Sequence, residues 1–271
     1  MAKRLMAVLV AVCASTGCAH ISLSPSTLSR VKSPAFISRV IDGAGPKALV
    51  FRDDSSYAGK LKKLEPAEAD RRLAVKLKKG MSRFELSESL RAKVTAALPG
   101  DPPWSSTLDP ARVATSLESF LVEEVPANAP DYNLLKPLGA DAVVEFVIES
   151  YGMRSRRGHA GTFVEGYGRM FFIDGGGDIW RRSFTADQID SDSPHVDPFK
   201  VAKEPTTFRD QMNTLLEGVA AQFAKDLNPS GASSEHRALP STPAGDTEDR
   251  RPGPDSSPRK EPEDLPPPDA L

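Results

Sequence analysis

The stretch Leu138–Thr185, which reads LGADAVVEFVIESYGMRSRRGHAGTFVEGYGRMFFIDGGGDIWRRSFT, decides the fold of this chain. Apolar residues alternate along its first part, and those on one face are Ala142, Val144, Phe146 and Ile148. A second alternating run covers 163–172, and a third apolar segment starts at Ile179. Alternation with a period of two is typical of half-buried strands. Between the last two runs lies DGGGD (174–178), where glycine permits the positive φ of a tight turn. The stretch therefore predicts an antiparallel meander of three strands.

Helix and strand signals flank this meander. Two short strands are predicted upstream. One is the apolar run Lys47–Phe51, and the other is Arg72–Lys78, in which leucine and valine recur at every second position. One helix follows the capping box that starts at Ser82, a second starts at Asp109-Pro110 and ends near residue 126, and a third starts at Thr207. We therefore expect an α+β (α/β) fold: one domain over 46–228, with a mixed, largely antiparallel sheet and about three helices.

The regions outside that domain have a different composition. Residues 18–45 are rich in serine and interrupted by prolines, which predicts a tether, although Ser33–Ile37 also fits an edge strand. Residues 229–271 contain ten prolines, no aromatic residue, and nine acidic against five basic residues. Such a segment buries too little apolar surface to offset its ordering entropy, so the tail is predicted to be disordered.

The first eighteen residues carry the most specific signal. Lys3 and Arg4 precede an apolar run over 5–14, which has the length of a signal-peptide core and is too short to cross a bilayer. The run ends in Ser15-Thr16-Gly17-Cys18, and small residues directly before a cysteine resemble the bacterial lipobox, although its usual leucine is replaced by Ser15. The prediction is a lipoprotein signal peptide over 1–17 and acylation of Cys18. The alternative is an ordinary secretory peptide that is cut near Ala14 or Gly17.

Lipidation of Cys18 would decide the location of the protein. Several acyl chains, palmitate among them, make a durable membrane anchor. Ala19 follows the cysteine, and in lipoproteins the lack of an aspartate there points to the outer membrane, on its periplasmic face or at the cell surface. The only other cysteine is Cys13, so the body of the chain has no disulfide and no thiol nucleophile.

No catalytic motif is recognised, and no cofactor is expected. The formal net charge of −2 does not favour a nucleic-acid partner. An acidic loop offers weak candidates for a metal site, namely Asp190, Asp192, His195 and Asp197, with Asp187 beside them. The candidate interaction residues are the basic hairpin tip and two tryptophans: Arg154, Arg156, Arg157, Trp104 and Trp180.

Three features together resemble a group of bacterial envelope lipoproteins. They are the lipobox, the strand that starts with Gly139-Ala140-Asp141, and the turn and strand over Asp174–Trp180 before a last helix. The group has the small α/β domain of the TolB amino-terminal region, the curli secretion lipoprotein and the penicillin-binding-protein activator lipoproteins. The resemblance implies binding or assembly with an envelope partner, and no enzymatic activity.

The sequence thus favours a lipid-anchored binding or assembly factor in the cell envelope. Two alternatives remain open: a peptidoglycan-binding module that uses the Arg154–Arg157 tip, and a metal-dependent hydrolase built around Asp187–Asp197. The identity of the partner, the oligomeric state and the role of the acidic tail stay open as well.

Overall fold

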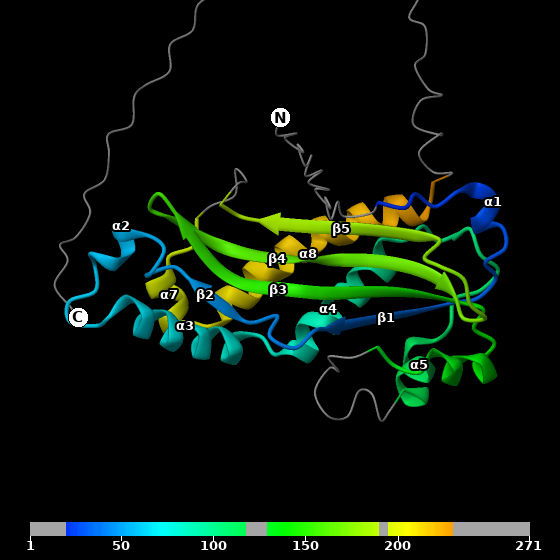
Figure 1. Ribbon diagram of the computed structural model, residues 1–271, viewed down its shortest axis with the longest axis horizontal. Coiled ribbons are helices and arrows are strands. Elements are labelled where there is room, and N and C mark those ends of the chain that lie inside the picture. The colour runs from blue at the N-terminus through cyan, green and yellow to red at the C-terminus, as the bar shows by residue number, and fades with distance from the viewer. Residues whose placement is uncertain (1–19, 118–128, 190–194, 230–271) are drawn as a thin grey trace, which may run out of the picture. The chain divides into compact units, whose positions relative to one another are not determined.

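The meander forms three of the strands of a single five-stranded sheet (Figure 1). A computed structural model describes residues 20–117, 129–189 and 195–229. The predicted signal peptide, Cys18 and nearly all of the predicted tail lie outside these residues. The elements, in chain order, are α1 (Pro25–Leu28), β1 (Pro34–Val40), β2 (Lys47–Leu49), α2 (Ser55–Ala58), α3 (Pro66–Gly80), α4 (Arg83–Ala97), α5 (Pro110–Ser116), η1 (Tyr132–Leu138), β3 (Ala142–Arg156), β4 (His159–Phe172), β5 (Trp180–Asp187), α7 (Pro198–Lys203) and α8 (Thr206–Leu227).

The sheet is mixed, as the sequence predicts. β3, β4 and β5 are antiparallel neighbours, with Val144 opposite Met170 and Met170 opposite Trp180. β1 and β2 both run parallel to β3 and pair with successive parts of it on the side away from β4. A register shift between Ile148 and Ser150 bends the long β3–β4 ribbon. The three-strand meander and the fold class are both confirmed.

Two helices, α4 and α8, cover one face of the sheet (Figure 1). The α8 residues buried on that face recur three or four positions apart: Phe208, Met212, Leu216, Val219 and Phe223. They pack on the β3 face that the alternation predicts, where Phe146 stacks on Phe223 at 5.2 Å between ring centroids. A smaller apolar cluster lies on the opposite face, where α5 and η1 cover the start of β1 and β3.

Part of the predicted tether belongs to the folded domain. Pro34–Val40 forms β1, all seven of its residues are buried, and it pairs with β3 from Ala142 to Ile148. The tether interpretation is therefore wrong for this stretch, and the edge-strand alternative is right. The prediction failed because Ser38 and Arg39 look like solvent-exposed residues, whereas the fold buries both.

The predicted strand over Arg72–Lys78 is also wrong, because these residues lie in the helix α3. Leucine and valine at 73, 75 and 77 satisfy a period of two, but the buried positions Ala69, Leu73 and Leu77 are four apart. Pro66 at the first helical turn favours the helix, since its missing N–H is not needed there. Val75, which a strand would have buried, is 57% exposed.

The other helix predictions hold with small changes. Ser82 and Glu85 form the predicted capping box at the start of α4. α5 starts at Pro110 as predicted and ends at Ser116, while residues 118–128 are outside the described part of the chain. α8 starts one residue before Thr207, without a side-chain cap. Four short helices among the described residues are not predicted from the sequence, namely α1, α2, η1 and α7.

Candidate functional site

In the basic hairpin tip between β3 and β4, Arg154 is held by ion pairs within the fold. Arg154 donates a 2.5 Å hydrogen bond from Nε to Asp187, forms a 3.1 Å ion pair with Glu165, and stacks on Phe163. Arg156 also has interactions within the fold. Arg157 sits in the turn itself, with a φ of 54°. The cavity beside the tip, about 220 Å³ in volume, is therefore lined by charges that already have partners.

The two tryptophans are core residues. Trp104 is 5% exposed, packs against Phe36, and donates a 2.8 Å hydrogen bond from Nε1 to Thr107. Trp180 is 1% exposed and meets Phe223 edge to face. Neither ring is open to a partner on the surface.

The acidic loop does not bring a metal site together within the described residues. Asp187 holds Arg154, and Asp197 accepts a 3.0 Å hydrogen bond from the Phe199 N–H at the start of α7. His195 packs against His159 with 4.0 Å between ring centroids. Asp190 and Asp192 lie outside the described residues. In the described part of the chain no group of three or more histidine, cysteine or acidic side chains is placed to hold an ion.

A buried charge cluster ties β1, η1 and the meander together on the sheet face opposite α8. Glu145 is fully buried, and its Oε1 accepts hydrogen bonds from Arg39 Nε at 2.8 Å and from the Tyr132 hydroxyl at 2.6 Å. Its Oε2 accepts a 2.5 Å bond from Arg169 Nε. Burial and the Glu145 carboxylate raise the pKa of Tyr132 well above its usual range. Burial alone would lower the pKa of Arg169, but Glu145 outweighs it and raises that pKa. Glu145 thus accepts from all three groups, and Arg169 has a second, more distant anion in Asp178 at 3.9 Å. We interpret the cluster as structural, because its side chains are held by one another.

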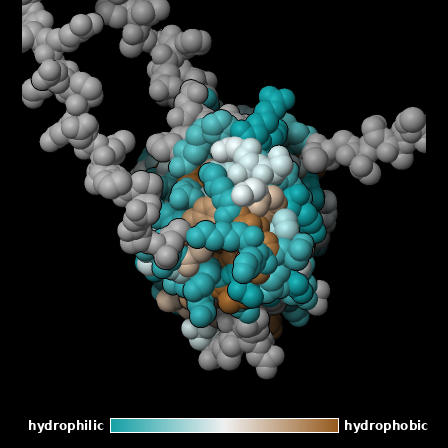
Figure 2. Space-filling model, turned by 90° about the vertical axis from the view of Figure 1, so that its left-hand side faces the viewer, coloured by the Kyte–Doolittle hydropathy of each residue, from teal (hydrophilic) through white to brown (hydrophobic). Residues whose placement is uncertain are grey.

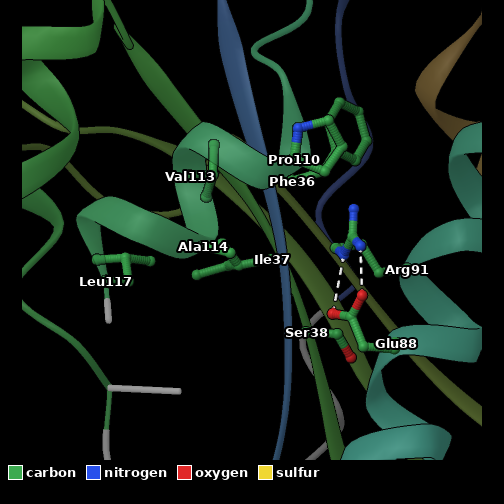
Figure 3. A pocket seen from close by; sticks show the side chains of 9 residues that line it. All are labelled: Phe36, Ile37, Ser38, Glu88, Arg91, Pro110, Val113, Ala114 and Leu117. Carbon is green, nitrogen blue, oxygen red and sulfur yellow. Dashed lines mark hydrogen bonds and ion pairs between the residues drawn. The ribbon is translucent and has the colours of Figure 1, made fainter. Parts of the chain in front are cut away.

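A narrow groove lies between α4, the edge of β1 and α5 (Figure 3). Phe36 and Val113 contribute apolar walls, and Glu88 and Arg91 on α4 form an ion pair at its rim. The Ser38 hydroxyl is buried there without a hydrogen-bond partner among the described residues. The groove encloses about 30 Å³, which is room for roughly one or two water molecules. That volume is well below the about 300 Å³ at which drug-sized pockets begin.

The exposed face of α3 carries several cationic side chains around one exposed apolar residue. Val75 lies at the centre of the exposed face, and helical geometry places Arg71, Arg72, Lys78 and Lys79 around it at three and four positions on either side. We call these five residues the α3 surface. Glu68 pairs with both arginines, whereas Lys78 and Lys79 are exposed and have no side-chain partner in the described residues. α3 starts at the left-hand end of the molecule in Figure 1. Figure 2 shows this end, where hydrophilic side chains surround a smaller hydrophobic area.

The α3 surface lies at the opposite edge of the sheet from the start of the described chain. Ile21 exchanges two 2.9 Å backbone hydrogen bonds with Arg181 on β5, which is one edge strand. α3 packs against β2, on the other edge (Figure 1). The sequence did not predict this surface, because the segment 72–78 was expected to be a strand. In a strand, Val75 would lie in the core and the lysines would lie on the opposite, solvent-exposed face. No helix among the described residues is long and apolar enough to cross a membrane.

Comparison with known proteins finds similar folds at low sequence identity. No family model and no curated protein matches the chain. Among solved structures, lipoprotein GNA1162 from Neisseria meningitidis is 14% identical, covering 72% of this chain and 99% of its own, with a TM-score of 0.34. Protein XCC0632 from Xanthomonas campestris, of family DUF330, is 10% identical over 80% and 93% of the two chains, with a TM-score of 0.35. PelC from Paraburkholderia phytofirmans, which forms a dodecamer, is 9% identical over 77% and 94%, with a TM-score of 0.30. These values are too low to carry an argument about function.

Proposed function

We propose that this protein is a lipid-anchored envelope lipoprotein that binds an acidic partner protein through the α3 surface. The leader supports the anchor: a positive start, a short apolar run and small residues lead directly to Cys18. The TolB-like and curli-secretion-like resemblance supports a binding or assembly role and stays a prediction. Binding requires no catalytic residues, and the proposal assigns none.

The observation that carries the binding role is an exposed valine surrounded by four cations. Val75 is 57% exposed, and the side chains of Arg71 and Arg72 are 77% and 67% exposed. Protein interfaces typically combine an apolar centre with a charged rim, and complementary charge gives specificity and fast association. An anionic polymer would contact the cations but would gain little from Val75. The arrangement therefore favours an acidic protein surface with a small apolar depression.

The position of α3 fits an anchored protein. Ile21 lies three residues after Cys18, so a lipid on that cysteine would hold the β5 edge near the membrane. α3 would then face away from the membrane, toward the envelope space. An anchor also raises the local concentration of the domain for any partner at the same membrane.

The test is cross-linking mass spectrometry in intact envelopes. The native chain is compared with Lys78→Gln/Lys79→Gln and with Val75→Ser. The native chain should capture a discrete acidic partner, and each variant should bind it about 5–30-fold more weakly, which corresponds to about 1–2 kcal/mol. Thermal unfolding of each variant checks that α3 is intact.

The matched control is Lys62→Gln/Lys63→Gln, which removes the same charge from two exposed lysines before α3 and outside the α3 surface. It should leave capture unchanged. Equal loss in both double variants, with Val75→Ser unaffected, would point to a charged polymer and contradict the proposal. Unchanged capture by Lys78→Gln/Lys79→Gln would contradict it directly.

The two alternatives have less structural support. Peptidoglycan binding through the hairpin tip would have to do without Arg154, which is already paired with Asp187 and Glu165. A metal-dependent hydrolase would need the acidic loop, where Asp187 and Asp197 already hold other groups.

A further inference from the structure

The outer side of β5 is an open sheet edge (Figure 1). β5 pairs with β4 on its inner side, and on its outer side the described residues supply one backbone pairing, between Ile21 and Arg181. The backbone groups of successive residues in an edge strand point alternately toward the neighbouring strand and away from it. Because the N–H and C=O of Arg181 both bond to Ile21, those of Ser183 and Thr185 also point outward. Both residues are exposed, and in the described part of the chain their outward backbone groups have no hydrogen-bond partner.

The pairing of Ile21 with Arg181 fixes the register of any residues that continue it. The N–H of each residue donates a 2.9 Å hydrogen bond to the C=O of the other, which is the hydrogen-bonded pair of an antiparallel ladder. Such pairs recur at every second residue along both strands. The next pair in this register is Ala19 opposite Ser183, and Ala19 is the residue directly before the described part of the chain.

The residues on either side of Ile21 already alternate as in a strand. His20 and Ser22 both lie with Trp180 and Lys225 on the α8 side of the sheet. Ser22 Oγ is 3.2 Å from His20 Nε2, as expected for two residues whose side chains leave an extended backbone on the same side. The chain therefore reaches β5 in an extended conformation, and adding the next pair needs no change of direction.

We propose that Cys18 and Ala19 continue this stretch along β5 as a sixth, outer strand. The Ala19 N–H would donate to the Ser183 C=O, and the Ser183 N–H would donate to the Ala19 C=O. In a mature chain that starts at Cys18 no residue remains to face Thr185, so the added strand would end there. The covered part of the edge could no longer pair with a strand of another chain.

This strand would determine where the lipid leaves the domain, a step that rests on the proposed acylation of Cys18. Side chains alternate between the two faces of a sheet, so the side chain of Cys18 would lie on the same side as that of His20, toward α8. Pairing of Ala19 would leave no free tether between the lipid and the sheet. The anchor would therefore hold the domain in one orientation, with the β5 edge toward the membrane and the α3 surface away from it.

The test is amide hydrogen exchange, followed by NMR, of the chain 18–271 with Cys18→Ala, which carries no lipid. Three outward-facing amides of β5 are compared after correction for their intrinsic exchange rates. Arg181 N–H, which bonds to Ile21, is the protected reference, and Thr185 N–H is the open reference. Ser183 N–H should exchange about fivefold to tenfold more slowly than Thr185 N–H, the slowing that one hydrogen bond gives.

Variants at the start of the chain test whether Ala19 is the cause. In a chain that starts at His20, the protection of Ser183 should disappear while that of Arg181 remains. Ala19→Pro, which lacks the N–H, should reduce the protection of Ser183 several-fold. Ala19→Val keeps the N–H, favours a strand and is the matched control, so it should retain the protection.

Three results would overturn the proposal. The first is a Ser183 N–H that exchanges as fast as Thr185 N–H in the chain 18–271. The second is unchanged protection of Ser183 in the chain that starts at His20. The third is protection of both Ser183 and Thr185 that rises with protein concentration, because a second copy would then cover the edge. Since the measurement uses a chain without lipid, an unmodified Cys18 in cells would contradict the anchor without affecting this result.

Discussion

Replacing Glu145 with glutamine should destabilise the fold more than any other single change of charge on the sheet. The Glu145 side chain has no exposed surface and is the acceptor for Arg39, Arg169 and Tyr132. Glutamine keeps the shape and one acceptor oxygen, but it removes the negative charge that compensates the two arginines. The variant therefore isolates the electrostatic part of the cluster.

The size of the effect follows from how much water each arginine can reach. Breaking a buried ion pair by removing one partner costs about 3–5 kcal/mol. The Arg39 side chain is 9% exposed and cannot rehydrate, whereas Arg169 is 22% exposed and retains a distant ion pair with Asp178 at 3.9 Å. We therefore expect a loss near the lower end, about 3 kcal/mol, which for a domain of this size lowers the Tm by about 6–12 °C.

Urea unfolding followed by circular dichroism measures this loss, with an unchanged m-value as the sign that only stability has changed. The matched control is Glu165→Gln, because Glu165 is on β4 with its side chain 35% exposed and pairs with Arg154. Such a partly exposed pair contributes about 1 kcal/mol or less. A loss below about 1 kcal/mol for Glu145→Gln, equal to the control, would refute the view that the cluster is buried and compensated.

Three other changes test the packing and the turns. Gly168→Ala should cost about 1–3 kcal/mol, because the new Cβ would come within 2.5 Å of Trp180. Tyr151→Phe should stabilise the domain by about 1 kcal/mol, because it removes a buried hydroxyl without a partner in the described residues. Burial also raises the pKa of Tyr151 to about 12, so the native chain should lose stability between pH 10 and 12 more steeply than this variant. Asp54→Ala should cost about 0.5–2 kcal/mol, because Asp54 caps α2 and also holds the hairpin turn.

Each of these has its own check by urea or thermal unfolding. Gly218→Ala is the control for Gly168→Ala: nothing lies near its added Cβ on the exposed side of α8, so it should stabilise the helix by up to about 1 kcal/mol.

Burial opposes ionisation of Asp54, but hydrogen bonds from Gly158 and Ser56 outweigh it and lower its pKa. The contribution of Asp54 to the free energy of unfolding is therefore fully present above the usual pKa of aspartate. It is lost as the pH falls through the lowered pKa of Asp54 in the folded protein. An Asp54→Ala difference that stays constant down to pH 2 would contradict this assignment.

The parts of the fold that the sequence predicted correctly depend on local patterns. The meander follows from apolar alternation in β3 and β4, and the start of α4 follows from the Ser82–Glu85 capping box. Both signals lie within about ten residues and need no knowledge of distant contacts.

The parts that failed depend on contacts between distant residues. The burial of Arg39 in β1 depends on Glu145, 106 residues later, which accepts its hydrogen bond. In α3, Asp70 accepts backbone N–H bonds from Val50 and Phe51, and Gly80 fits closely against Pro205. The period of two at Leu73–Leu77 is compatible with a strand, but these tertiary contacts favour the helix. The α3 surface could not be predicted from the sequence, because its five residues share one face only when this segment is a helix.

The proposed function depends first on the lipid at Cys18, and the most direct measurement is the mass of the N-terminal peptide of the mature protein isolated from bacterial envelopes. An N-terminal Cys18 carrying diacylglycerol and a further acyl chain is the predicted result. A mature chain that starts elsewhere, or that carries an unmodified Cys18, would contradict the anchor and with it the orientation proposed for the α3 surface.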